Sequence, residues 1–220
     1  MTLRPELGDL PLRLRGLPLD RGYPVPWFVA WSDGRPEFRA ADPQKFARAI
    51  REKRCWVCGQ PLGKFLAFVI GPMCAINRTS SEPPCHHECA VWSAQHCPFL
   101  SRPHMVRRED AISEAAFAGD AAIPRNPGVA GIWTTLTYHV FKAPRDAAMG
   151  YLIRMGNAER VEWFAEGRPA TRAEVLASID SGIPLLLEAT EREATTADKH
   201  AALEELQRAR RAIDRLLPAA

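Results

Sequence analysis

The 220-residue chain has no apolar run long enough to cross a bilayer, which takes about 20 consecutive residues. Its start, Met-Thr-Leu-Arg-Pro-Glu-Leu-Gly-Asp, contains acids and a proline but no apolar stretch, so it does not resemble a secretory signal. We therefore expect a cytoplasmic protein with no membrane partner. In that reducing compartment, the six cysteines serve as thiols or metal ligands rather than as disulfides.

The short signatures of several enzyme classes are also missing. The chain has no glycine-rich phosphate loop and no dinucleotide-binding fingerprint, and Ser93 does not lie in a nucleophile elbow. Zinc deaminases place His-x-Glu before Pro-Cys-x-x-Cys, whereas here no His-x-Glu comes first and the cysteine after Cys85 lies four residues on. The sequence therefore gives no support to these chemistries.

A strong excess of one charge is absent as well, because the formal net charge is +3. Residues 1–105 carry 14 Lys and Arg against 9 Asp and Glu, a net of +5, and residues 106–220 carry 15 against 17, a net of −2. A mildly basic first half permits contact with nucleic acid but does not require it.

What the chain does contain is a pair of metal-ligand motifs. Cys55 and Cys58 lie in Cys-Trp-Val-Cys-Gly, and His86 and Cys89 repeat the two-residue gap after 27 intervening residues. A tight turn presents the first pair, and the first turn of a helix presents the second. Soft ligands paired at this spacing are typical of zinc sites. We predict that Cys55, Cys58, His86 and Cys89 bind one structural Zn²⁺.

Other ligand sets stay open. Cys85 can replace His86, since residues three or four apart share a helix face. Cys74 and Cys97 can approach the site, although buried free thiols commonly act as small apolar groups. Four thiolates would suit an iron–sulfur cluster, for example on Cys55, Cys58, Cys89 and Cys97. A catalytic zinc needs an open position; the nearest carboxylate, Glu88, suits the helix dipole.

The sequence predicts an α+β fold with four segments. These are an irregular N-terminal arm (1–26), a zinc-binding module (27–105), a helix and Pro-rich linker (106–128), and a C-terminal α+β module (129–220). Apolar patterns and turn signals predict strands at 27–31, 37–39, 64–73, 133–141, 149–155 and 159–164, and helices at 42–54, 86–96, 171–181 and 196–217. The last helix is amphipathic, and its apolar stripe is expected to pack on the protein's own core rather than to form a dimer. The oligomeric state stays open.

One strand–turn–helix pattern occurs twice. Val29-Ala-Trp31 followed by Gly34-Arg35-Pro36 resembles Val161-Glu-Trp163 followed by Gly167-Arg168-Pro169, and each copy continues with x-x-Arg-Ala and a helix. Glycine and proline recur in turns by default, so the match does not by itself establish a duplication.

The order of turn, strand, loop and helix-borne ligands resembles a treble clef. Some treble clefs are His-Asn-His nucleases, which need a further histidine before the metal helix. The chain has none between Cys58 and His86. Gly71-Pro-Met-Cys-Ala-Ile-Asn-Arg78, Glu82-Pro-Pro-Cys-His86, Cys97-Pro-Phe-Leu100 and Ser181-Gly-Ile-Pro184 resemble a family of bacterial and phage proteins without an assigned activity. That resemblance spans most of the chain from Tyr23 and implies a phage or mobile-element setting.

Tryptophans and arginines alternate in the first half, a combination that can stack on and clamp single-stranded nucleic acid. Its simpler interpretation is that Trp27 and Trp31 fill the core. We predict phosphate contacts at Arg35, Arg39, Arg107 and Arg108. The expected function is a zinc-stabilised binding or adaptor protein whose partner is nucleic acid or another protein. The alternative is a metal-dependent hydrolase, with a nuclease first; no catalytic residue is assigned.

Overall fold

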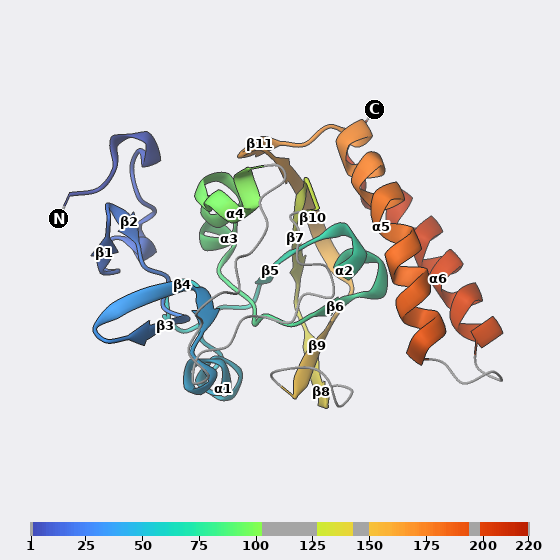
Figure 1. The fold of residues 1–220 in the computed structure, drawn as a ribbon, viewed down its shortest axis with the longest axis horizontal. Coiled ribbons are helices and arrows are strands. Elements are labelled where there is room, and N and C mark those ends of the chain that lie inside the picture. Colours follow the sequence, from blue (N-terminus) through green and yellow to red (C-terminus); the bar gives the residue numbers. More distant parts are fainter. Residues whose placement is uncertain (1, 103–126, 143–149, 194–198, 220) are drawn as a thin grey trace.

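A four-stranded antiparallel sheet forms the centre of the computed structural model, which describes residues 2–102, 127–142, 150–193 and 199–219 (Figure 1). Its strand order is β11 (Arg168–Pro169), β10 (Ala158–Ala165), β7 (Ala130–Thr135) and β5 (Leu66–Ile70). Ile132 of β7 pairs with Val69 of β5 on one side and with Glu162 of β10 on the other. The described residues form a mixed α+β fold, as the sequence predicts.

The sheet is covered on both faces, because alternate residues of its strands enter different apolar cores. Ala67 and Ile132 join one core with the cysteines and α3 (His87–His96), whereas Phe68 and Trp133 join a second core on the opposite face. The second core also contains residues of α2 (Pro72–Asn77), α5 (Arg172–Glu193) and α6 (Lys199–Ile213).

The shared sheet corrects the predicted division into a zinc module and a separate C-terminal module. β5 comes from segment 27–105, and its partner β7 comes from segment 129–220. Both cores also mix residues of the two segments. A buried strand must satisfy its backbone hydrogen bonds, and the strand that pairs along the whole of β5, β7, lies beyond the predicted boundary. The helix predicted after Arg107 lies outside the described residues.

The N-terminal arm is packed rather than irregular. It contains two 3₁₀ turns, η1 (Pro5–Leu7) and η2 (Leu12–Leu14), and a short hairpin of β1 (Leu19–Asp20) and β2 (Tyr23–Pro24). The Leu14 side chain is fully buried in the core that holds the cysteines. The arm is therefore part of the folded structure.

The predicted hairpin and helix that follow the arm are confirmed. β3 (Val29–Ser32) pairs with β4 (Arg35–Ala41), and α1 (Pro43–Arg51) begins directly afterwards. The Asp42 carboxylate accepts hydrogen bonds from the Gln44 and Lys45 backbone N–H groups at 2.8 and 3.3 Å. This N-cap and Pro43 at the first position explain where the helix starts.

The apolar run after the cysteine turn divides into two elements. β5 ends at Ile70, and Gly71-Pro72 begins α2, so Cys74 lies on a helix and not at the end of a strand. β6 (Thr79–Ser80) then pairs with β9 (Tyr151–Met155), which also pairs with β8 (Tyr138–Lys142). After α3, Cys97 precedes the short helix α4 (Pro98–Ser101).

The two C-terminal helices pack against α2, beside the second core (Figure 1). α5 continues past Ser181, where the prediction ended it, and includes Pro184. A Cβ at Gly182 would lie 2.9 Å from the Met73 side chain, so this glycine permits close packing of α5 on α2. Leu206, Ile213 and Leu217 contact the second core, as predicted for the last helix. Among the described helices, none combines the length and apolarity needed to cross a membrane.

The repeated sequence pattern adopts the same local structure twice. The φ angles are positive at both turn residues of each copy: 50° at Asp33 and 73° at Gly34, and 52° at Glu166 and 78° at Gly167. Each pair joins two antiparallel strands ahead of a helix. The surroundings differ: Trp163 is 4% exposed in the central sheet, and Trp31 is 46% exposed on a two-stranded ribbon. The expectation that Trp31 fills the core is therefore wrong.

Candidate metal centre

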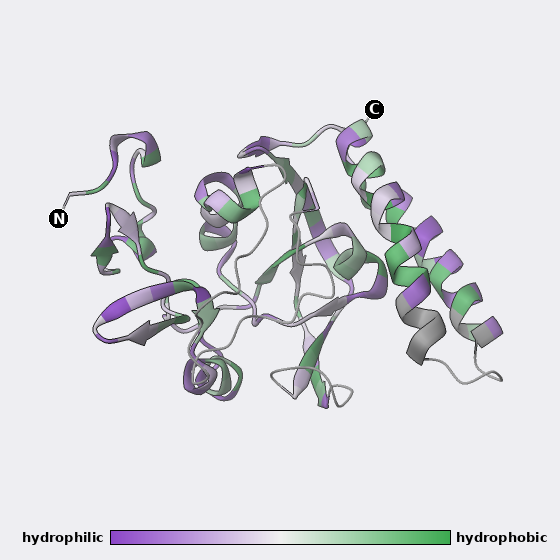
Figure 2. Ribbon diagram, viewed as in Figure 1, coloured by the Kyte–Doolittle hydropathy of each residue, from purple (hydrophilic) through white to green (hydrophobic). Residues whose placement is uncertain are grey.

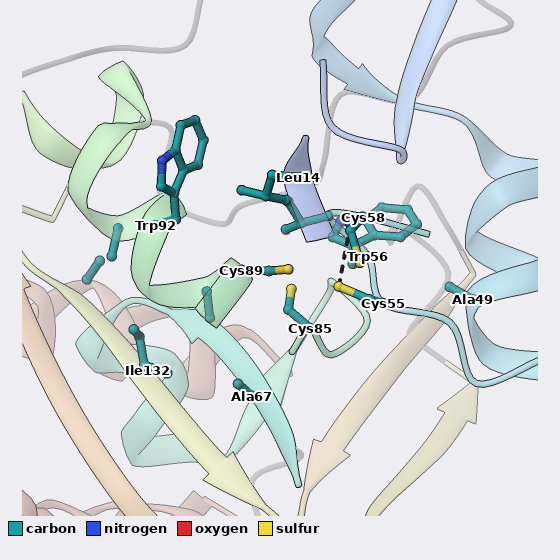
Figure 3. Packing of buried hydrophobic residues seen from close by; sticks show 14 of the residues in the cluster. Leu14, Ala49, Cys55, Trp56, Cys58, Ala67, Cys85, Cys89, Trp92 and Ile132 are labelled. Carbon is teal, nitrogen blue, oxygen red and sulfur yellow. Dashed lines mark hydrogen bonds between the residues drawn. The ribbon is translucent and has the colours of Figure 1, made fainter. Parts of the chain in front are cut away.

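The four predicted ligands come together. The Sγ atoms of Cys55, Cys58 and Cys89 and a ring nitrogen of His86 all lie within 4.8 Å of one another. Figure 3 shows the three cysteines. Zinc–sulfur bonds of about 2.3 Å in a tetrahedron place ligand atoms about 3.8 Å apart, so the cluster can close around one ion with small side-chain movements. The three cysteines are buried, and His86 is half-buried. The chemistry of this donor set therefore fits a four-coordinate metal ion.

Local hydrogen bonds shape the turn that carries Cys55 and Cys58. The Gly59 N–H donates to the Cys55 carbonyl at 2.8 Å, and the Arg54 guanidinium donates to the Gly59 carbonyl at 2.9 Å. Gly59 has φ +72°, and a Cβ there would lie 2.6 Å from the Trp27 ring. Only glycine meets both conditions without strain, which explains the residue after the second cysteine.

The second ligand pair lies at the start of α3. His86 is the extended N-cap residue, and Cys89 belongs to the first helical turn. The preceding residue, Cys85, forms an antiparallel bridge with Ala67 of β5 through hydrogen bonds of 2.6 and 3.0 Å. The central sheet thus fixes the point at which the chain enters α3, and with it the positions of both ligands.

Backbone groups surround the cluster with hydrogen bonds suited to a metal site. The N–H groups of Cys58 and His86 donate to Cys55 Sγ at 3.5 and 3.4 Å. His86 Nε2 lies 3.0 Å from the Pro61 carbonyl, which can only accept, so Nε2 carries the proton. The other nitrogen, Nδ1, is 3.3 Å from Cys58 Sγ and directs its lone pair into the cluster.

The thiols of the cluster lie close enough to shift one another's pKa values. Burial raises the pKa of Cys55, but hydrogen bonds from the Cys58, Cys85 and Cys89 thiols outweigh burial and lower that pKa. The hydrogen bond between Cys58 and Cys55 raises the pKa of Cys58 to about 11. A hydrogen bond with Cys55 also raises the pKa of Cys89. A cation bound by these sulfurs would compete with their protons, because cysteine binds metal as the thiolate.

The N-terminal arm also reaches this centre, a contact that the sequence analysis missed. Arg13 Nε lies 2.6 Å from Glu88 Oε1 on α3, and Arg13 Nη1 donates to Gln60 Oε1 at 2.9 Å. Leu14 lies beside the cysteines (Figure 3). The alternation of leucine and arginine in residues 10–15 is the only sequence signal for this packing. Glu88 is a first-turn acid, as expected, and it pairs with Arg13.

The remaining cysteines separate into two groups. Cys85 is buried beside Cys55 and Cys89, whereas Cys74 lies on α2 and Cys97 at the end of α3, and neither belongs to the four-residue cluster. All six cysteines are free thiols. The iron–sulfur set that included Cys97 is therefore not the set that the fold assembles.

Two of the four predicted phosphate contacts, Arg35 and Arg39, lie in the described part of the chain, both on β4. Arg35 is exposed at the β3–β4 turn, but Arg39 makes a two-point ion pair with Glu37 at 2.7 and 2.6 Å. Because side chains alternate along a strand, Trp31 and Arg35 lie on opposite faces of the hairpin. The Trp31 ring and the Arg35 guanidinium therefore cannot clamp the same strand of nucleic acid. Arg107 and Arg108 lie outside the described residues.

A more compact group of cations lies on α1 and just beyond it, where the prediction named none. Arg48, Arg51 and Lys53 are exposed, and we call these three residues the α1 basic surface. Hydrogen bonds from Arg54, Arg48 and Arg51 lower the pKa of Glu52 to about 2. One carboxylate therefore faces three guanidinium groups, which leaves this surface positive. Hydrophilic residues colour parts of α1 and the neighbouring β3–β4 hairpin in Figure 2.

Open hollows among the described residues lie away from the cluster. One is lined by Arg4, Tyr23 and His96 among others, and another by Glu162, Trp163 and Leu217 among others. Neither includes a residue of the metal centre. Comparison of the chain with protein-family models, curated proteins and solved structures finds no match.

Proposed function

We propose that this chain is a zinc-stabilised binding or adaptor protein rather than an enzyme. The observation that carries the proposal is the donor set itself: three cysteines and one histidine lie within 4.8 Å of one another, and the second histidine nitrogen is tied to Pro61. Four protein ligands saturate Zn²⁺ and leave no position for water or substrate. Such a site supplies folding free energy instead of Lewis acidity.

The elements that meet at the centre support a structural role. One ligand pair follows α1, the other begins α3, and the N-terminal arm contacts both through Arg13. Zinc would join these elements at one point. The placement of ligands on a turn and on a helix start agrees with a treble-clef-like centre. A phage or mobile-element setting is proposed from the sequence resemblance alone.

Nucleic acid is the first partner to test, and the α1 basic surface is the best candidate contact. Residues 42–54 carry five Lys or Arg against two Asp or Glu. Three guanidinium groups already converge on the single Glu52 carboxylate. A phosphate would offer these guanidinium groups a second anion. Cys55 directly follows residues 42–54, so zinc bound at Cys55 would fix the C-terminal end of this segment.

The alternative function, a metal-dependent hydrolase, has one observation in its favour. His87 Nε2 lies 2.6 Å from Glu162 Oε2, and both side chains are partly exposed. Such a pair can move a proton, but His87 and Glu162 lie outside the four-residue cluster and lack an open metal position beside them. The closed donor set therefore favours the binding protein.

Two measurements test the proposal. Elemental analysis of the purified chain should find about one zinc per molecule, as four ligands at one centre require. Binding to DNA and RNA is then measured over a salt series for the wild type, for R48A/R51A, and for R208A/R211A, which removes two exposed arginines from α6 as a control. Each lost phosphate contact should flatten the slope of log affinity against log salt by roughly 0.7 to 0.9.

The outcomes separate the parts of the proposal. Loss of affinity in R48A/R51A alone supports the α1 basic surface. Equal behaviour of both double variants, or no binding by the wild type at low salt, would direct the search to a protein partner. Zinc-dependent cleavage of nucleic acid that H87A abolishes would support the hydrolase instead.

A further inference from the structure

A fifth thiol lies at the metal centre. The Cys85 side chain is 3% exposed, and Figure 3 shows its sulfur beside those of Cys55 and Cys89. Cys85 is not one of the four residues whose ligand atoms lie within 4.8 Å of one another, so it is a neighbour of that group. Tetrahedral zinc uses four ligands, so the fold brings together one more donor than the ion needs.

Backbone pairing keeps Cys85 at this position. Its N–H donates to the Ala67 carbonyl at 2.6 Å, and the Ala67 N–H donates to the Cys85 carbonyl at 3.0 Å. Because Ala67 lies in the edge strand of the central sheet, Cys85 cannot move away from the cluster without breaking that bridge. With the backbone held in this way, the sulfur would approach an ion on Cys55 and Cys89 by rotation of the Cys85 side chain.

Charge explains why His86 is the better fourth ligand for zinc. Three thiolates and a neutral imidazole leave the zinc centre with a net charge of −1, whereas four thiolates leave −2. The extra charge is costly in a buried site. When no imidazole is available, however, a thiolate is a strong soft ligand, and an open position in a buried centre is the poorer alternative.

We propose that Cys85 is an alternative fourth ligand that completes a four-thiolate site with Cys55, Cys58 and Cys89 when His86 does not bind the ion. This inference rests on the proposed zinc centre and extends it to a fifth donor. As Cys85 Sγ binds the ion, the thiol releases its proton to the buffer, and no electron is transferred. The centre then keeps its ion through changes at His86 that would otherwise leave a coordination position open.

The test uses the full chain with Zn²⁺ and with Co²⁺, whose sulfur charge-transfer absorption grows with the number of bound thiolates. The variants are H86A, H86Q, H86A/C85S and, as a matched control for the loss of a thiol, H86A/C74S. H86Q keeps an amide that can donate to the Pro61 carbonyl. Metal affinity is measured by competition with a colorimetric chelator, and folding by circular dichroism.

We expect H86A and H86A/C74S to bind one ion, with a charge-transfer band about one-third stronger than in the wild type because four thiolates replace three. H86A/C85S should bind at least about tenfold more weakly, since even loss of an outer contact costs that much. Equal bands and affinities in H86A and H86A/C85S would overturn the inference. So would failure of both H86A and H86Q to bind while the wild type binds zinc. If the wild type binds no zinc, the proposed function is wrong, and so is this inference, which rests on it.

Discussion

Replacing Leu14 with alanine tests whether the N-terminal arm is part of the metal-bearing core. Leu14 is fully buried and Leu12, two residues away in the same 3₁₀ turn, is 76% exposed. The two substitutions remove the same atoms from the same element. Any difference between L14A and L12A therefore reports burial and not the intrinsic preference of alanine.

The expected magnitude follows from that burial. Removing a fully buried leucine loses a transfer free energy of about 1.5 to 3 kcal/mol and adds a cavity, so the total lies at about 2 to 5 kcal/mol. L12A should change the free energy of unfolding by less than about 0.5 kcal/mol. For a chain of this size, L14A should lower Tm by roughly 4 to 20 °C.

The assay is urea and thermal unfolding of the three proteins at one saturating zinc concentration, because bound zinc adds to the stability of the folded state. Zinc transfer to a competing chelator provides a second readout. Leu14 lies beside the cysteines, so L14A should release zinc faster than L12A does. Equal stabilities and equal release rates for the two variants would show that the arm does not cover the centre.

Four further predictions address the metal, a helix start and the shared sheet. C55S removes the sulfur that accepts hydrogen bonds from Cys58 and His86, so it should abolish zinc retention and destabilise the fold more than C74S; equal effects on chelator-sensitive unfolding would contradict this. T171A removes the reciprocal cap between Thr171 and Glu174 and should cost about 0.5 to 2 kcal/mol at pH 7 in urea unfolding. Hydrogen bonds from Arg168 and Thr171 lower the pKa of Glu174 to about 2, so E174Q should be destabilising at pH 7 and lose this effect as the pH falls towards 2; a pH-independent cost would exclude the charged contact. A fragment of residues 129–220 lacks β5 and should not unfold cooperatively; a sharp thermal transition in circular dichroism would show that it folds alone.

Local signals in the sequence predicted local structure correctly. The cysteine turn depends on neighbouring residues, since Gly59 and Arg54 complete its hydrogen bonds. The start of α1 depends on Asp42 and Pro43. The equal gaps in the two ligand pairs identified the metal cluster for the same reason, because each pair presents its side chains within one turn.

Errors arose where structure depends on partners distant in the sequence. Pro184 normally indicates a helix end, yet α5 continues through it, and Gly182 of this helix packs closely against Met73. The pairing of β5 with β7 joins residues more than 60 positions apart. The Arg13–Glu88 ion pair joins the arm to α3 over a similar distance. No local pattern predicts such contacts, since each depends on which surfaces meet after folding.

The positions of these distant contacts bear on what zinc would do. The sheet ladder and the second core, with α5 and α6, hold the C-terminal strands to β5 without the metal ligands. By contrast, three elements meet at the cluster: the arm, the cysteine turn and the start of α3. The Ala67–Cys85 bridge links the cluster to the sheet. Loss of zinc should therefore first loosen the face that carries the arm and α1, and only afterwards the face covered by α5 and α6. Because α1 leads directly into Cys55, a partner bound to the α1 basic surface should slow zinc release, and zinc should strengthen its binding by the same factor.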